Sequence, residues 1–269
     1  MFHIALGIEY DGSRYHGWQT QNDKLTLQTT LETALSQIAD EPIQTICAGR
    51  TDAGVHAVEQ VIHFDTSKNR AHTAWTLGTN TLLPKDISIK WATEVSDEFN
   101  ARRSALNRHY RYIIYNHPVH SALLRSHALW YPYPLDDARI EQALPYLLGE
   151  QDFSSLRDSD CQSKTPMRRI DRLSIKRYQK FLIIDVVANA FLHHMVRNIV
   201  GVLLAVGNRK KSPEWVSDML AAKTRTAAGI TAAACGLYFV HATYPEKFSL
   251  PQATTEEISM FPIIEPLSN

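Results

Sequence analysis

The chain has 269 residues, 44% of them hydrophobic, and its 28 basic residues balance 28 acidic ones, so its formal net charge is zero. This length suits one large domain or two coupled lobes. The zero total excludes a protein that attracts nucleic acid by net charge alone. Positive charge is instead local, within 102–111, 168–172 and 209–211, and such clusters are usually solvated faces unless a ligand uses them.

Three cysteines, Cys47, Cys161 and Cys235, are far apart, and no CxxC pair occurs. This pattern excludes a disulfide framework and a cysteine zinc site, and it predicts a reducing, cytoplasmic setting. The N-terminus enters a predicted strand at once, without a basic region and apolar core typical of a signal peptide. No apolar run approaches the ~18–20 residues that a membrane helix needs.

The first 115 residues predict strands interrupted by two helices. Apolar residues at helical spacing from Leu27 to Ile38 predict a helix with Thr26 as its N-cap. A shorter helix is predicted over 75–83, stopped by Pro84. The predicted strands are residues 3–10, 43–47, 58–64, 87–91 and 110–115.

The second half begins after a connection, residues 116–134, that is rich in Pro, His and Tyr. A helix is predicted over 136–148, with Asp136 as its cap and Pro145 as a kink or restart. Ser212-Pro213-Glu214 is a strong helix start. The remaining predicted elements are a hairpin of 170–177 with 181–189, a long helix over 195–207 and a last strand over 237–241.

Short links and the hairpin favour mostly antiparallel pairing, which predicts an α+β fold with two lobes. We expect an N-terminal lobe over 1–115, the connection over 116–134, a C-terminal lobe over 135–245 and a tail over 246–269. The two halves share a loose similarity of layout, but no repeat is convincing in the sequence.

The chain is organised around the loop Ala48-Gly49-Arg50-Thr51-Asp52-Ala53-Gly54-Val55-His56-Ala57. Two glycines bracket an Arg-Thr-Asp core, and glycine permits a tight turn or the close approach of another backbone. Asp52 therefore lies at the tip of a loop held between regular elements, where a scaffold can present a reactive group. An ordinary Asp/Gly turn is the competing interpretation.

The loop resembles the signature of TruA-type tRNA pseudouridine synthases, and further motifs of that family run through nearly the whole chain. These motifs are the segments 5–12 and 17–19, Arg108-His109-Tyr110-Arg111-Tyr112, Gly149-Glu150-Gln151-Asp152-Phe153 and the run 189–201. The resemblance implies two α/β lobes around a shared, mostly antiparallel sheet with a central basic cleft. It implies an isomerase that converts uridine to pseudouridine at positions 38–40 of the tRNA anticodon stem-loop, acting as a homodimer without metal or cofactor.

The resemblance also implies site residues. Asp52 is the nucleophile, Arg197 pairs with it, Arg50 helps to extrude the target base and Tyr110 stacks on the uracil. The stretches expected to touch tRNA are Phe99-Asn100-Ala101-Arg102-Arg103 and Asp160-Cys161-Gln162-Ser163-Lys164, with Arg70 as a weaker candidate. Whether Asp52 attacks the sugar or the pyrimidine ring, and which group removes the C5 proton, stay open.

Each residue also has a structural interpretation. An Arg in an apolar helix needs a partner because unpaired buried charge is costly, so Arg197 could form an ordinary salt bridge. Tyr110 could be a core or interface tyrosine. His193 and His194 are adjacent, so on a helix they would point about 100° apart and make a poor chelating pair.

Two other functions compete. An RNA-binding or RNA-folding protein without catalysis would use the same basic and aromatic residues, but it would not need Asp52 together with Arg50 and Arg197. A metal-dependent base-modifying enzyme would need ligand spacing such as HExxH, which is absent from the sequence. No phosphate-binding glycine motif indicates a nucleotide cofactor either.

Overall fold

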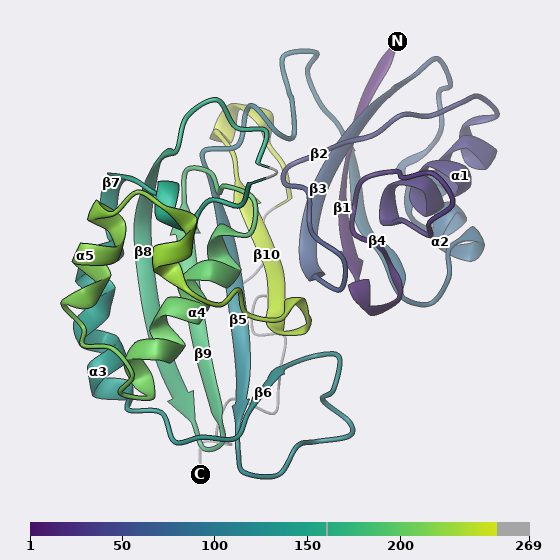
Figure 1. The fold of residues 1–269 in the computed structure, drawn as a ribbon. Coiled ribbons are helices and arrows are strands. Elements are labelled where there is room, and N and C mark those ends of the chain that lie inside the picture. Colours follow the sequence, from purple (N-terminus) through teal and green to yellow (C-terminus); the bar gives the residue numbers. More distant parts are fainter. Residues whose placement is uncertain (160, 252–269) are drawn as a thin grey trace, which may run out of the picture. The chain divides into compact units, whose positions relative to one another are not determined.

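A computed structural model of the chain describes residues 1–159 and 161–251 (Figure 1). The chain divides into two compact units, one built from Met1–Arg108 together with the segment that starts at Tyr238, and the other from His109–Leu237. Strands of both units are mostly antiparallel, and helices flank them. The α+β fold predicted from the sequence is therefore confirmed. No helix among residues 1–159 and 161–251 is long and apolar enough to cross a membrane.

The first unit is a sheet with helices on it. Its strands are β1 (Phe2–Tyr10), β2 (Ile46–Cys47), β3 (His56–Thr66), β4 (Ile87–Glu94) and β10 (Leu237–Thr243). They lie in the order β4-β1-β3-β10, with β2 paired to β3. β1 is antiparallel to both β3 and β4, whereas β10 runs parallel to β3. The chain thus returns to this unit after building the other.

Helix α1 (Leu27–Ala39) and the shorter α2 (Thr79–Leu82) lie side by side against these strands (Figure 1). α1 begins where predicted, because the Thr26 side chain accepts a hydrogen bond from the Thr29 amide and so satisfies one free helix-end donor. A π-turn (Ala74–Gly78) leads into α2, and the helical segment ends before Pro84 as expected.

The second unit is also a sheet covered by helices. Its strands are β5 (Asn107–Asn116), β6 (Leu129–Tyr131), β7 (Gly149–Asp152), β8 (Met167–Tyr178) and β9 (Phe181–Ala188). The order is β5-β9-β8-β7, with β6 parallel to β5. The predicted hairpin is confirmed: Tyr178 pairs with Phe181, and Gln179 in the turn has φ +52°.

Helices α3 (Asp137–Ala143), α4 (Met195–Gly207) and α5 (Trp215–Ala221) gather on one face of these strands (Figure 1). Asp136 caps α3 as predicted, and the 3-10 turn Leu144–Leu147 takes over where Pro145 interrupts the α-helix. The long helix ends at Gly207 as predicted, and its apolar face is buried. Shorter 3-10 turns occur at Gly12–Arg14, Ser154–Leu156, Arg225–Ala228, Ala234–Gly236 and Glu246–Phe248.

The units do not coincide with the lobes predicted from sequence. The division falls between Arg108 and His109, within β5, rather than in the connection 116–134, and that connection contains β6. β10 was expected in the second lobe, but its pairing with β3 through Tyr238↔His56 and Phe239↔Ala57 joins it to the first unit. Of the predicted tail, residues 252–269 lie outside the described part of the chain.

Candidate active site

Asp52 lies in a turn between β2 and β3 in the first unit. The turn is closed by a hydrogen bond from the Val55 amide to the Asp52 carbonyl (3.2 Å), and Gly54 adopts φ +79°. Thr51 and Val55 on either side are buried, whereas Asp52 is half-buried. The loop is therefore buried on both sides of Asp52, which lies at its tip, as the sequence predicted.

Two glycines of the segment after β1 let its backbone pack directly against this loop. A Cβ atom on Gly17, which has φ +89°, would lie 2.8 Å from the Thr51 carbonyl oxygen and 3.2 Å from the Asp52 carbonyl carbon. A Cβ atom on Gly12 would lie 1.9 Å from the Val55 carbonyl oxygen. The adjacent Trp18 amide donates to the Thr51 carbonyl (2.9 Å). Only glycine allows this approach without displacing the loop.

Buried side chains hold the rest of the loop backbone. The Tyr10 hydroxyl lies 2.8 Å from the Thr51 hydroxyl, and burial raises the pKa of Tyr10 above its ordinary value, so the phenol stays neutral. The Gln60 amide group donates to the Gly49 carbonyl (2.6 Å) and accepts from the Gly49 amide (3.3 Å). Gln60 is fully buried, so these bonds satisfy groups that have no access to water.

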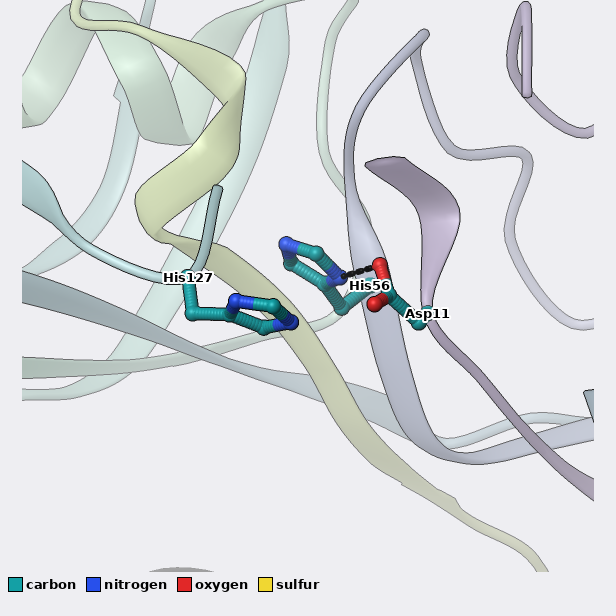
Figure 2. A group of neighbouring side chains, drawn as sticks. All are labelled: Asp11, His56 and His127. Carbon is teal, nitrogen blue, oxygen red and sulfur yellow. Dashed lines mark ion pairs between the residues drawn. The ribbon is translucent and has the colours of Figure 1, made fainter. Parts of the chain in front are cut away.

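His56, at the end of the loop motif, ties β3 to the segment after β1. Its Nδ1 lies 3.1 Å from an Asp11 carboxylate oxygen (Figure 2). The same nitrogen lies 3.2 Å from the Gly12 amide nitrogen. Its ring stacks on Tyr238 of β10, with ring centroids 4.7 Å apart. His56 is almost completely buried. In this unit the His56 side chain thus has a structural role: it holds the segment after β1 against β3, next to the Asp52 loop.

The basic residues near the loop have different positions. Arg50 is exposed, so its guanidinium is accessible to a ligand. Arg108 is buried and directs its guanidinium at backbone carbonyls, those of Ala48 (3.2 and 3.3 Å), Ala105 (3.2 Å) and Arg102. Arg108 therefore links the Asp52 loop to the segment 102–105 rather than forming part of an exposed basic surface.

The second unit carries Tyr110 and Arg197. Tyr110 lies in β5 and is 8% exposed, and its ring meets that of Phe191 edge to face with centroids 5.0 Å apart. Arg197 is half-buried in the first turns of α4, and its Nε donates to the Ala232 carbonyl (2.8 Å). Both side chains are therefore held by contacts within their own unit.

His193 and His194 precede α4 and pack against each other, with ring centroids 3.9 Å apart. His194 is not yet helical, since its φ is +59°, and its Nδ1 lies 2.8 Å from an Asp158 carboxylate oxygen. The prediction that adjacent histidines diverge by about 100° assumed that they lie on the helix, and it is wrong because the helix begins at Met195.

The first predicted RNA-contact stretch is a hydrogen-bonded turn. The Asn100 side chain accepts from the amides of Arg102 (3.1 Å) and Arg103 (3.0 Å), which leaves both arginine side chains exposed. Phe99 and Ala101 are buried, at 2% and 0% exposure. These two residues anchor the turn, and Arg102 and Arg103 are its accessible cations.

Two buried histidines, His3 and His63, hold the backbone of this turn. His3 contributes Nε2 at 2.8 Å from the Phe99 carbonyl, and His63 accepts from the Ala101 amide at Nδ1 (3.1 Å). The other ring nitrogen of His3 lies 2.5 Å from the Asp65 carboxylate. Burial, and then the proximity of His3, lower the pKa of His63 to about 4, so the acceptor is a neutral imidazole at physiological pH.

The second predicted RNA-contact stretch begins with Asp160, which lies outside the described residues. The following residues wrap around Arg157, which donates to the carbonyls of Cys161 (2.9 Å) and Ser163 (2.8 Å). Gln162 and Lys164 are exposed. Although burial alone would raise it, amide hydrogen bonds and nearby Arg157 bring the pKa of Cys161 below its usual value.

Comparison with known proteins places these residues in a family. A family model described as tRNA pseudouridine synthase matches residues 7–102 and 143–245. The protein named tRNA pseudouridine synthase A from Pseudoalteromonas atlantica is 53% identical, over 93% of this chain and 95% of its own. Proteins of the same name from Salmonella arizonae (52%; 94% of this chain, 93% of theirs) and Colwellia psychrerythraea (53%; 93% and 96%) are equally similar.

The chain belongs to the tRNA pseudouridine synthase family. The matched ranges of the synthase family include Arg50, Asp52 and Arg197, whereas Tyr110 falls between them. Among solved structures, a chain of a Cbf5-Nop10-Gar1 complex aligns at a TM-score of 0.33 and 10% identity, over 74% of this chain and 54% of that chain, which is too weak a likeness to support a conclusion.

Four residues that contact the Asp52 loop from other parts of the chain were not predicted as site residues: Gly12, Gly17, Gln60 and Arg108. The contact of Gly17 with Thr51 spans 34 positions of the chain, that of Arg108 with Ala48 spans 60, and that of Gln60 with Gly49 spans 11. Gly12 and Gly17 lie within the motif segments, so the signal is present in the sequence. Arg70 is exposed, and its Nε donates to the Ile38 carbonyl at the end of α1 (3.2 Å).

Proposed function

We propose that this chain isomerises uridine to pseudouridine in the anticodon stem-loop of tRNA, at positions 38–40, with Asp52 as the nucleophile. The proposal rests on the Asp52 loop. Thr51 and Val55 on either side of it are buried, and Asp52 lies at its tip. The chain belongs to the synthase family. A carboxylate fixed in this way can attack without first reorganising the loop.

The reaction breaks the bond between C1′ of the ribose and N1 of uracil and forms a bond from C1′ to C5. The C5 proton is released and N1 gains a proton, so the product is an isomer of the substrate. The nucleophile holds one fragment while the base turns, which needs neither a redox partner nor a cofactor in the balanced equation.

We assign supporting roles to three other residues. Exposed Arg50 helps to displace the target base from its stack, a step that costs a few kcal/mol. Tyr110, whose ring is fixed by Phe191, stacks on the uracil. Arg197, whose guanidinium is fixed by the Ala232 carbonyl, is the cation that favours the ionised form of the catalytic carboxylate.

We further propose that the turn bearing Arg102 and Arg103, together with Gln162, Lys164 and Arg70, contacts tRNA phosphates, and that two copies of the chain share one tRNA. The exposure of these side chains supports the first part. The zero net charge supports the second, because a dimer doubles the local basic surface that a neutral chain presents to a polyanion.

The activity is tested by mapping the product. An unmodified tRNA transcript with uridines at positions 38–40 is incubated with the protein, treated with carbodiimide and alkali, and copied by reverse transcriptase, which stops at pseudouridine adducts. Stops one nucleotide 3′ of positions 38–40, and at no other place, are expected. Stops elsewhere would overturn the site assignment, and none at all, despite tRNA binding, would favour an RNA-binding protein without catalysis.

A further inference from the structure

Residues 225–236 cross over helix α4 and bond to Arg197, and we call this segment the strap. It starts with the 3-10 turn Arg225–Ala228 and ends with the turn Ala234–Gly236 before β10. The crossing is possible because α4 has Gly201 there: a Cβ atom at this position would lie 1.8 Å from the Ile230 carbonyl oxygen. The strap thus touches the helix backbone one turn beyond Arg197.

The strap and Arg197 are joined by two reciprocal hydrogen bonds. The Ala232 amide donates to the Arg197 carbonyl (3.1 Å), and the Arg197 Nε donates back to the Ala232 carbonyl (2.8 Å). A bond at Nε restricts rotation of the guanidinium plane, so it also sets the directions of the two terminal nitrogens. The orientation of Arg197 therefore depends on where the strap holds Ala232.

A buried polar network fixes that part of the strap. Asn198 is fully buried, and its Oδ1 accepts from the Thr231 hydroxyl (2.7 Å) and from the Arg225 guanidinium (3.0 Å). Arg225 also donates to the Thr231 hydroxyl (2.6 Å) and to the Gly229 carbonyl (2.8 Å). Asn198 in turn donates to the Leu156 carbonyl (2.8 Å), which orients its amide.

The far end of the strap is fixed to the strand that carries Tyr110. The Tyr112 hydroxyl donates to the Ala233 carbonyl (2.6 Å), and a Cβ atom on Gly236 would lie 2.6 Å from the Ile113 carbonyl oxygen. The successive carbonyls of Ala232 and Ala233 thus accept hydrogen bonds from Arg197 and Tyr112, respectively. The far end of the strap is thus held by β5, and the network at Asn198 holds Arg225 and Thr231.

We propose that Arg225 and Thr231 are positioning residues for catalysis: through Asn198 they hold the strap so that the Ala232 carbonyl orients the Arg197 guanidinium. This inference rests on the proposed role of Arg197 in pseudouridine formation. Neither residue needs to touch substrate, because each acts through hydrogen bonds inside its own unit. A poorly oriented guanidinium slows the chemical step and leaves tRNA binding intact.

Thr231→Val tests the network with little change in side-chain volume, because it removes only the hydroxyl, which bonds to both Arg225 and Asn198. Thr231→Ser restores the hydroxyl. Thr226→Val makes the same chemical change on the same segment at an exposed position whose hydroxyl contacts only Thr224 (3.4 Å) among the bonds described. Arg225→Met provides a second disruption if Thr231→Val fails to fold.

The first measurement is hydrogen exchange of the Arg197 Nε proton by ¹⁵N NMR, with the signal identified by its loss in Arg197→Lys. We expect exchange to be about tenfold faster in Thr231→Val and in Arg225→Met, and unchanged in Thr231→Ser and Thr226→Val. Unchanged exchange in both disrupting variants overturns the positioning role. This measurement needs no tRNA, so it stands apart from the proposed activity.

The second measurement is the single-turnover rate on tRNA. We expect Thr231→Val to lower the rate about tenfold, with tRNA affinity within about twofold of wild type. In the Arg197→Lys background the same substitution should cause no further loss, since the orientation of the arginine no longer matters. An equal loss in both backgrounds overturns the inference, whereas an inactive wild-type protein overturns the proposed function itself.

Discussion

Gly17 shows how a single residue supports the Asp52 loop from another part of the chain. Its backbone lies against Thr51 and Asp52, and its φ of +89° is a conformation that other residues adopt at a cost of roughly 1–3 kcal/mol. Gly149 offers a matched comparison, because it has φ +83° but a Cβ atom there would have no neighbour within 4 Å. Comparing substitutions at these two glycines therefore distinguishes the effect of backbone strain from the effect of displacing the loop.

We expect Gly17→Ala and Gly149→Ala both to lower the melting temperature by a few degrees, in line with about 1 kcal/mol or more of strain. Only Gly17→Ala should also lower turnover, by about tenfold or more, because the added methyl group pushes against the Thr51 carbonyl. Thermal unfolding and steady-state rates check this. Equal turnover losses in the two variants would contradict the loop argument.

His63 gives the protein a pH-dependent stability. Its folded pKa is about 4, held down by burial and by His3, although Asp65 opposes the shift. An unfolded histidine titrates near 6.5, so between about pH 6.5 and pH 4 the unfolded chain binds a proton that the folded chain does not. The free energy of unfolding should therefore fall as the pH falls through this window.

Urea unfolding at about pH 7.5 and pH 5 tests this expectation. His63→Asn keeps an acceptor for the Ala101 amide and removes the titration, so its stability should fall less between the two pH values than that of wild type. His16→Asn, at an exposed position, should behave like wild type. A pH dependence that is identical in wild type and His63→Asn would show that His63 is not responsible.

At the scale of elements, the turn 99–104 is the part of the fold that we propose contacts RNA. Two histidines fix its backbone and Asn100 shapes it, so Arg102 and Arg103 project from a rigid base. Because the backbone of the turn is already fixed, binding of a phosphate by these arginines does not have to order the turn. The turn is therefore where we expect charge to matter most for tRNA affinity.

Replacing Arg102 and Arg103 together with Ala should weaken tRNA binding and reduce the slope of log K against log salt by about one for each phosphate that these arginines neutralise. Filter binding between low and moderate salt measures both. Arg14→Ala is the control, because that exposed arginine pairs with Asp86 (3.2 Å). If the double variant kept the wild-type slope, this turn would not be a phosphate-binding element.

Elements with strong local signals could be predicted from the sequence, and those defined by distant partners could not. α1 follows from helical spacing and the Thr26 cap, and the β8–β9 hairpin from two apolar runs around a short turn. β6 and β7 have only three and four residues, too few to show a periodic pattern. The position of Asp52 in a loop likewise follows from its motif. Arg108 also lies in a motif, but nothing local indicates that its side chain reaches Ala48, and Gln60 carries no local signal.

For the whole molecule, the two compact units begin and end at other residues than the lobes expected from the sequence. A Pro-rich connection suggested a boundary at 116–134, but strand pairing, not local composition, decides which unit a segment joins. β10 belongs with β3 because two residue pairs, Tyr238↔His56 and Phe239↔Ala57, fix a parallel register. That pairing is invisible in a single sequence.

The proposed homodimer is a prediction at this same scale. Analytical ultracentrifugation at micromolar concentration should give about twice the 30.5 kDa of one chain. A neutral chain gains by pairing, because two copies present two sets of Arg102 and Arg103 to one polyanion. A single species at the monomer mass throughout the range used for activity measurements would rule the dimer out.

The central claim, that Asp52 is the nucleophile of a uridine isomerase, is tested most directly with tRNA that carries tritium at uridine C5. Wild-type protein should release tritium to water as C5 exchanges its proton for the bond to C1′. Asp52→Asn, nearly the same size but without the negative charge, should release none and still bind tRNA. Release by Asp52→Asn at the wild-type rate would contradict the mechanism, and no release by either protein would contradict the activity.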